Sequence, residues 1–393
     1  MTTTTAQKYG LSAEDLDELG RELDAIRQRV VDDLGQEDVD YMRRMIKVQR
    51  GLEIAGRGLL FAGWFPPAWL AGTTALGISK ILDNMEIGHN VMHGQYDWTR
   101  DPALSAKGFD WDTACPGDQW RHSHNYLHHT FTNILGKDRD VGYGILRMSE
   151  DQRWTPVALG NPLFATLLAL NFDQGVMLHD VEIERLLSRK KTFAEAWPTL
   201  RDGLRKSGKL AAKDYVIWPA LTGPAFLSTL AGNFVANTMR NLWAFTIIFC
   251  GHFPDGTHEF TEEECAGSGA RAPGGLGESK GHWYFRQMLG SANITGGKLF
   301  HVLSGNLSHQ IEHHLFPDLP ARRYKAVASE VREVCERYGL PYNSGSLSKQ
   351  FGSVVRKIVK LALPTRAKPA PRRPAAATTV RRAPSPTPVS VPA

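Results

Sequence analysis

Histidines at metal-ligand spacing are the strongest chemical signal in this chain of 393 residues. Eight of the fourteen histidines form three short clusters, each built on a pair separated by four positions. The three clusters are His89 and His93; His124, His128 and His129; and His309, His313 and His314. Residues four apart lie on one face of a helix, so each pair can direct two imidazoles at one metal ion.

The number of histidines predicts two metal ions rather than one. Neutral imidazole is a good ligand for iron, zinc, copper and nickel. A tetrahedral zinc site takes four ligands, so eight histidines suit two metal ions that keep open coordination positions. We therefore expect a dinuclear centre.

Motifs that the sequence lacks narrow the chemistry further. It has no H-E-x-x-H, so a zinc protease with a glutamate base is not supported. Soluble di-iron carboxylate bundles use Glu-x-x-His on two helices, and only Glu86 with His89 has that spacing here. Neither G-x-G-x-x-G nor G-x-x-x-x-G-K-[ST] occurs, so we expect reducing power to come from a separate protein.

Three long segments without acidic or basic clusters must position the histidines. They are Gly58–Ser79, Trp154–Phe172 and Tyr215–Pro254, the last interrupted by Arg240 alone. A membrane-spanning helix needs about 20 apolar residues, so these lengths predict membrane spans, with buried core helices as the alternative. Because the clusters must meet on one side of the membrane, we expect residues 154–178 not to cross and Tyr215–Phe253 to form a hairpin.

The polar segments predict a helical cap. Apolar residues recur at helical spacing from Leu11 to Val30, which predicts an amphipathic helix with a capping box at Ser12 and Asp15. This helix could pack on the protein or lie on a membrane surface. The basic stretch 185–213 favours the cytoplasmic side.

Charge and cysteine content exclude several other classes. The net charge of +5 comes from residues 364–393, which hold six basic residues and no acidic one, so the rest of the chain carries −1. A nucleic-acid-binding function is therefore not indicated, and the Pro-rich tail is predicted to be disordered. Four cysteines without C-x-x-C spacing fit a reducing compartment. No cleavable signal peptide is expected at the N-terminus.

Three motifs in order carry a family resemblance. GHNVMHG, HSHNYLHHTFTNILGKDRDVGYG and GNLSHQIEHHLFPDLP resemble the three histidine boxes of the membrane-bound fatty acid desaturases, and the chain is similar to the actinobacterial acyl-CoA desaturases in particular. The resemblance extends from the amphipathic helix to about residue 360. It implies a non-haem centre of two iron ions that uses molecular oxygen and two external electrons to form a cis double bond in a long-chain acyl substrate.

The resemblance also assigns candidate ligands. The residues that match are His89, His93, His124, His128, His129, His313 and His314. His252, in FCGHFP, matches a further histidine that relatives carry between the second and third boxes. The third box departs from H-x-x-H-H because Gln310 takes the first position and His309 precedes it. We expect His309 to be the ligand, with Gln310 as the alternative.

Acidic residues after the second box are candidates for supporting the ligands. Asp138 and Asp140 could accept hydrogen bonds from imidazoles, or could belong to a solvated loop. His122 is expected near the site or at the surface, without binding metal. The remaining histidines, His179, His258, His282 and His301, are expected to be ordinary.

Together these observations predict an all-α membrane protein with four transmembrane helices and a cytoplasmic helical cap that holds the di-iron site. The expected segments are 1–45, an amphipathic helical region; 46–363, the desaturase domain; and 364–393, the tail. The resemblance implies an acyl-CoA or acyl-lipid substrate, contact with membrane lipids, and a separate ferredoxin or flavoprotein reductase. A multi-pass protein of a bacterial cell membrane follows from this interpretation. The Q-x-x-H-H form is also found in front-end desaturases, but the fused cytochrome b5 motif H-P-G-G is missing here.

Two other functions remain open at this point. A hydroxylase on the same scaffold would differ only in the geometry of the site. A non-enzymatic, His-rich membrane protein that binds or moves metal would need polar residues within the spans, and apart from Arg240 the apolar segments lack acidic and basic ones.

Overall fold

The computed structural model describes residues 4–265 and 277–365. Residues 366–393 of the predicted tail and residues 266–276 of the Gly-rich segment lie outside these ranges. The described part of the chain is mainly helical, with two short strands.

The elements of the first half carry the first two histidine clusters. They are α1 (Thr5–Lys8), α2 (Ala13–Asp32), α3 (Gln36–Leu60), α4 (Pro66–Ile81), η1 (Leu82–His89), α5 (Asn90–Met92), η2 (Asp97–Thr99), η3 (Pro102–Leu104), α6 (Gly117–Trp120), η4 (Arg121–His128), α7 (His129–Phe131), η5 (Val141–Gly144), η6 (Pro156–Gly160), α8 (Asn161–Leu170), α9 (Phe172–Val181) and α10 (Ile183–Leu187). Of these, η1 and η4 are π-helical turns.

The elements of the second half carry the third cluster. They are α11 (Phe193–Ala212), η7 (Lys213–Ile217), α12 (Trp218–Leu221), η8 (Gly223–Ala225), α13 (Phe226–His252), α14 (Glu262–Cys265), α15 (Lys280–Gly290), β1 (Asn293–Thr295), α16 (Lys298–Leu303), α17 (Gln310–Leu315), η9 (Ala321–Arg323), α18 (Tyr324–Arg337), β2 (Ser344–Ser346) and α19 (Leu347–Ala362).

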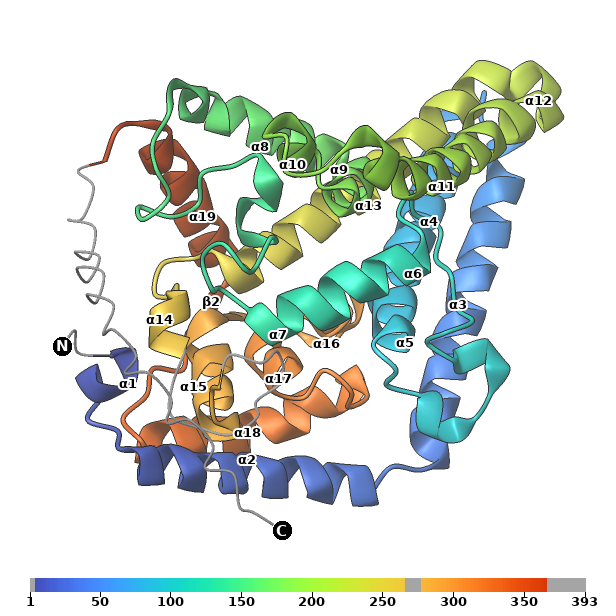
Figure 1. Cartoon of the computed structure of the whole chain (residues 1–393). Helices are drawn as coiled ribbons and strands as arrows, with labels where there is room; N and C mark the ends of the chain where they lie inside the picture. Colours follow the sequence, from blue (N-terminus) through green and yellow to red (C-terminus); the bar gives the residue numbers. More distant parts are fainter. Residues whose placement is uncertain (1–3, 266–276, 366–393) are drawn as a thin grey trace, which may run out of the picture.

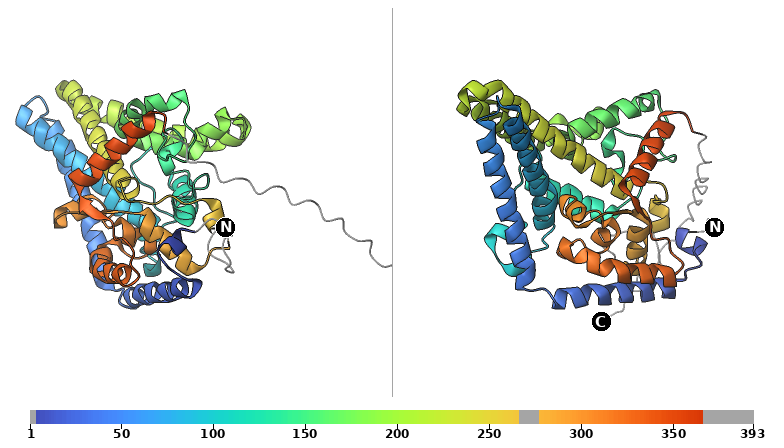
Figure 2. Two further views of the ribbon diagram at one scale, coloured as in Figure 1. Left: turned by 90° about the vertical axis from the view of Figure 1, so that its left-hand side faces the viewer. Right: turned by 180° about the vertical axis from the view of Figure 1, so that it is seen from behind.

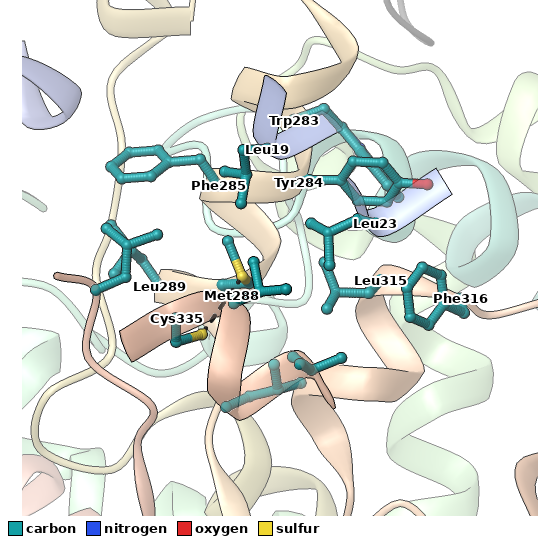
Figure 3. Packing of buried hydrophobic residues seen from close by; sticks show 14 of the residues in the cluster. Leu19, Leu23, Trp283, Tyr284, Phe285, Met288, Leu289, Leu315, Phe316 and Cys335 are labelled. Carbon is teal, nitrogen blue, oxygen red and sulfur yellow. Dashed lines mark hydrogen bonds between the residues drawn. The ribbon is translucent and has the colours of Figure 1, made fainter. Parts of the chain in front are cut away.

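Helix α2 forms the base of the molecule in Figure 1 and packs on α15 and α18, as the view from behind in Figure 2 also shows. Its apolar stripe is buried, and Leu19 and Leu23 are fully covered. Figure 3 shows both leucines facing Tyr284 and Met288 of α15 in the core of this region. The predicted amphipathic helix and its Ser12 capping box are therefore confirmed, and α2 packs on protein.

Helices α3, α4 and α13 form a second packed unit that rises at the right of Figure 1. Close approach of α3 and α4 depends on small residues: a Cβ at Gly56 would lie 2.9 Å from the Gly72 carbonyl oxygen. The chain then passes from α4 through η1 into α5 without a break, so the packed unit delivers the first histidine pair to the centre of the molecule.

The two strands tie the third histidine cluster to the C-terminal helix. β1 and β2 pair in parallel, with Asn293 opposite Ser344 and Thr295 opposite Ser346. The Asn293 side chain accepts a hydrogen bond from the Ile311 backbone N–H at 2.9 Å. The small sheet therefore fixes the start of α17.

The prediction of four transmembrane helices, and with it that of a multi-pass membrane protein, is wrong. Within residues 4–265 and 277–365, every helix falls short of the combined length and apolar character that crossing a bilayer requires. The uncharged segment Gly58–Ser79 is divided between the end of α3 and the 16-residue α4, which begins at Pro66. The segment Tyr215–Pro254 is likewise divided, between short turns and α13.

The structure also differs from the predicted membrane protein in burying charged side chains. We call the side chains of Arg57, Lys80, Asp112, Asp214 and Arg240 the charged cluster. Asp214 pairs with Arg57 at 2.7 Å and with Lys80 at 2.8 Å, and all three side chains are 4% exposed. Charges that flank the apolar segments in the sequence thus lie inside the packed unit, because their partners come from elements far along the chain.

Candidate metal centre

The first histidine pair lies on a continuous helical segment that becomes π-helical at the site. His89 ends the π-helical η1 and His93 follows α5, and their ring centroids are 4.5 Å apart. π-helical turns inside helices often mark functional sites. Both side chains are buried, at 6% and 9% exposure.

The second cluster also lies on a π-helical turn. The rings of His124 and His128 stack at 5.0 Å on η4, and His129 begins α7. Across the centre of the molecule, the His129 ring stacks on that of His314 at 4.6 Å. Figure 1 shows α7 and α17 lying close together at this point.

The third cluster and the end of α13 complete the arrangement. His313 and His314 lie on α17 with no exposed surface, and His252 is the last residue of α13. The His252 ring lies 4.9 Å from that of His314 and 4.8 Å from that of His128. Four separate segments therefore bring imidazoles to one place.

The ring nitrogens form overlapping groups that could hold metal ions. In each group the candidate ligand atoms lie within 4.8 Å of one another. The groups are His89, His93, His124 and His313; His128, His252 and His314; His129, His313 and His314; and His124, His128 and Asp140. We call the eight histidines in these groups the histidine cluster.

His309 is the one predicted ligand that the structure does not bring to the histidine cluster. Its ring stacks on His301 at 4.7 Å instead. The Gln310 amide nitrogen lies 3.1 Å from His252 Nε2, so Gln310 faces the cluster. A Cβ at Gly251 would lie 2.8 Å from Gln310 Cγ, which shows that glycine at this position allows Gln310 to lie against α13.

Ring nitrogens without hydrogen-bond partners are consistent with a role as metal ligands. Six members of the histidine cluster have a buried Nε2 atom without a hydrogen-bond partner within the described residues: His93, His124, His128, His129, His313 and His314. His309 Nε2, outside the cluster, is also unpaired. A buried polar atom left unpaired lowers stability by about 1–3 kcal/mol, so six in one place need an explanation. Coordination of metal ions by these nitrogens supplies one.

The opposite ring nitrogens are held by other side chains. His128 Nδ1 lies 3.1 Å from both oxygens of Asp138, and His314 Nδ1 lies 3.0 Å from Gln287 Oε1. His313 Nδ1 lies 3.3 Å from the Tyr324 hydroxyl. Such contacts fix the ring orientation and keep the proton on Nδ1, which leaves Nε2 free for a metal ion.

Two acidic residues expected near the ligands do lie there. Asp138 is 4% exposed and also accepts hydrogen bonds from the backbone N–H groups of Asn133 and Asp140. Asp140 Oδ2 lies 3.4 Å from His124 Nδ1. Burial lowers the pKa of His128, but the two carboxylates outweigh it and raise that pKa to about 9.

Burial lowers the pKa of the other imidazoles in the histidine cluster, which favours their neutral form. Burial, together with the neighbouring histidines, lowers the pKa of His89 to about 3. The pKa values of His93, His129 and His314 are well below the usual value for the same reasons. A neutral imidazole is the form that binds metal, so the burial of these rings favours coordination.

Two buried glutamates lie beside the histidines without entering the groups. Burial raises the pKa of Glu86 to about 8, and Glu86 accepts hydrogen bonds from Tyr41 at 2.6 Å and Asn306 at 3.1 Å. Glu312 is held in the same way by Tyr342 and Asn293. The Glu86–His89 spacing in the sequence therefore reflects a supporting contact network rather than a carboxylate ligand.

Several supporting residues could not be found from the sequence. Gln287, Tyr324 and His179 lie in segments without a motif, and Trp120 precedes the second cluster. The Trp120 ring stacks on that of His124 at 4.5 Å and meets those of His89 and His93 at 5.4 Å. Only the fold brings these side chains to the histidines.

Comparisons with known proteins agree with the three motifs. The family model for fatty acid desaturases matches residues 64–346, which include the whole histidine cluster. The chain is 46% identical over 358 residues to the NADPH-dependent stearoyl-CoA 9-desaturase of Mycobacterium tuberculosis, with 90% of this chain and 82% of the relative covered. It is 27% identical over 295 residues to the sn-1 linoleoyl-lipid 6-desaturase of Synechocystis sp., with 72% and 77% covered.

Proposed function

Since this chain belongs to the fatty acid desaturase family, we propose that it forms a cis double bond at carbon 9 of a long-chain acyl-CoA. Family membership confirms the resemblance drawn from the three motifs, and fatty acyl desaturation is the activity that the motifs predicted. The high identity to a relative named as a stearoyl-CoA desaturase supports a CoA ester as substrate. The relative named as acting on a lipid is much less similar, at 27% identity.

The observation that carries the proposal is the histidine cluster, in which seven of the eight imidazoles have a buried ring nitrogen without a hydrogen-bond partner within the described residues. We assign one iron ion to His89, His93, His124 and His313, and a second to His128, His252 and His314. His129 lies between the two groups and can serve either ion. Gln310, beside His252, is included as a further metal ligand. His309 is left out because its ring faces His301.

Two bound iron ions would supply the activation of molecular oxygen. Two hydrogen atoms leave adjacent methylene groups, and with two external electrons and two protons they convert one oxygen molecule into two water molecules. The residues of the chain hold the ligand rings: Asp138, Gln287 and Tyr324 each face an Nδ1 atom and fix the plane of its ring. Burial of the cluster excludes bulk water from the site.

Two observations support a separate electron donor. The chain has no nucleotide-binding loop of the G-x-G-x-x-G type, and the 46% identical relative is named as NADPH-dependent. We propose that a flavoprotein or ferredoxin-type protein passes the electrons from NADPH to this chain.

Expression with an electron-donor protein in a host that lacks unsaturated fatty acids tests the function. Mass spectrometry of derivatised acyl chains should show a new cis double bond at carbon 9. The matched variants are His128→Ala, expected to abolish the product, and His122→Ala, expected to leave it unchanged because His122 is exposed and its ring stacks on that of Tyr126. An unaltered acyl profile with an active donor and two bound irons would refute desaturation, and a hydroxylated product would favour a hydroxylase.

A further inference from the structure

Asp140 is shared by three imidazoles. Its Oδ1 accepts a hydrogen bond from His179 Nε2 at 2.9 Å. Its Oδ2 faces His124 Nδ1 at 3.4 Å and His128 Nδ1 at 3.6 Å. Because each carboxylate oxygen faces a different side, the His179 contact determines which way the other oxygen points.

His179 is fixed in turn by the loop that carries Asp140. His179 lies on α9 and is 5% exposed. Arg139 donates a hydrogen bond to the His179 backbone oxygen at 2.6 Å, and the Tyr143 ring packs 5.2 Å from the imidazole. Residues on both sides of Asp140 therefore hold α9 against the loop that follows the second histidine cluster.

Stability alone does not account for a histidine at this position. His179 Nδ1 is buried and has no hydrogen-bond partner within the described residues. An unpaired buried acceptor lowers stability, whereas an apolar side chain of similar size would not. The contact with Asp140 is thus the interaction that the imidazole provides.

The two supported ligands differ in their dependence on Asp140. His128 already faces both oxygens of Asp138, which backbone N–H groups hold in place. His124 has Asp140 as the only carboxylate that faces its Nδ1 within the described residues. Loss of the hydrogen bond between His179 and Asp140 should therefore affect His124 more than His128.

We propose that His179 is a positioning residue for the metal centre: it orients Asp140 so that His124 keeps its proton on Nδ1 and presents Nε2 to the first metal ion. This inference rests on the proposed two-metal centre. It further predicts that a change at His179 weakens one metal site, the group that contains His124, and leaves the group of His128, His252 and His314 intact.

Titration of the full-length chain with Co²⁺, followed by its visible absorption, tests the proposal. Wild-type protein should bind two equivalents. Outer contacts of this kind change metal affinity by about 10–100-fold, so His179→Leu should weaken one equivalent by that factor and alter its absorption bands. His179→Gln keeps an N–H donor and should restore most of the affinity, while His122→Gln serves as the unchanged control.

A double-variant comparison makes the test specific. In an Asp140→Asn background, His179→Leu should have little further effect, because both changes remove the same contact. Two equivalents bound by His179→Leu with wild-type affinity and spectrum would overturn the inference, as would independent effects of the two changes. If His179→Leu does not fold, equal losses in His179→Gln and Asp140→Asn would overturn it. Failure of wild-type protein to bind two equivalents would instead refute the proposed centre.

Discussion

The histidine cluster and the charged cluster are both buried and polar, but they differ in how many of their polar atoms have hydrogen-bond partners. In the charged cluster, Asp214 and Lys80 each pair with two partners, and Arg240 reaches the Asp112 backbone oxygen at 2.9 Å. In the described parts of the chain, Arg57 Nε is its one unpaired atom. The histidine cluster leaves a ring nitrogen unpaired on most of its members.

This difference separates a structural core from a binding site. Buried charges that neutralise one another stabilise a particular packing of α3, α4 and α13, and removing one partner leaves an uncompensated charge. Buried imidazoles with free nitrogens contribute little to that packing, and their arrangement is explained by a ligand. The two clusters should therefore respond to substitution in opposite ways.

The largest expected effect concerns Asp214 in the charged cluster. Asp214→Ala leaves Arg57 and Lys80 buried without their shared partner, so it should lower the free energy of unfolding by about 3–5 kcal/mol. Urea denaturation followed by circular dichroism measures the change. Asp202→Ala, at a half-exposed position on α11, is the control, and a loss below about 1 kcal/mol for Asp214→Ala would show that the cluster is not structural.

The acid response of the same residue should be smaller. Burial raises the pKa of Asp214, but the cations beside it outweigh burial and lower that pKa to about 2, against 3.8 in an unfolded chain. The stabilisation is thus present above pH 4 and is lost as the pH falls towards 2. The difference in unfolding free energy between wild-type protein and Asp214→Asn should shrink by about 2 kcal/mol over that range. A constant difference would contradict the assigned pairing.

A substitution in the histidine cluster should change the free energy of unfolding little and should lower the metal content. His313→Leu conserves volume and replaces a buried unpaired nitrogen, so metal-free protein should change in unfolding free energy by less than about 1.5 kcal/mol. Because His313 belongs to two of the ligand groups, metal content should fall by at least one ion per chain. Metal analysis and urea denaturation of the same preparation measure both. Severe destabilisation with full metal content would reverse the roles of the two clusters.

The smallest expected effect concerns Gln310. Gln310→His places an imidazole beside His252 and should keep both metal ions while shifting the absorption of the Co²⁺-loaded protein. His309→Gln should leave that absorption unchanged, because His309 faces His301. The opposite pattern would make His309 the ligand.

The sequence predicted the local features of this molecule well. Helical periodicity placed α2 and its capping box, and the spacing of four placed the first two histidine pairs on one face of a helix. These predictions succeed because they depend on residues within one or two helical turns.

Features that depend on distant residues were not predictable. The length of the uncharged segments suggested membrane spans. It could not show that a new helix begins at Pro66, or that Asp214 pairs with Arg57 across 157 positions. The choice between His309 and Gln310 depended on how α17 meets α13 at Gly251. His179 had no motif, since its role comes from the contact with Asp140 across 39 positions.

The iron content of the full-length protein, reconstituted and purified without oxygen, tests the central claim most directly. The arrangement of eight histidines predicts two iron ions per chain. One ion per chain, or none, would contradict it.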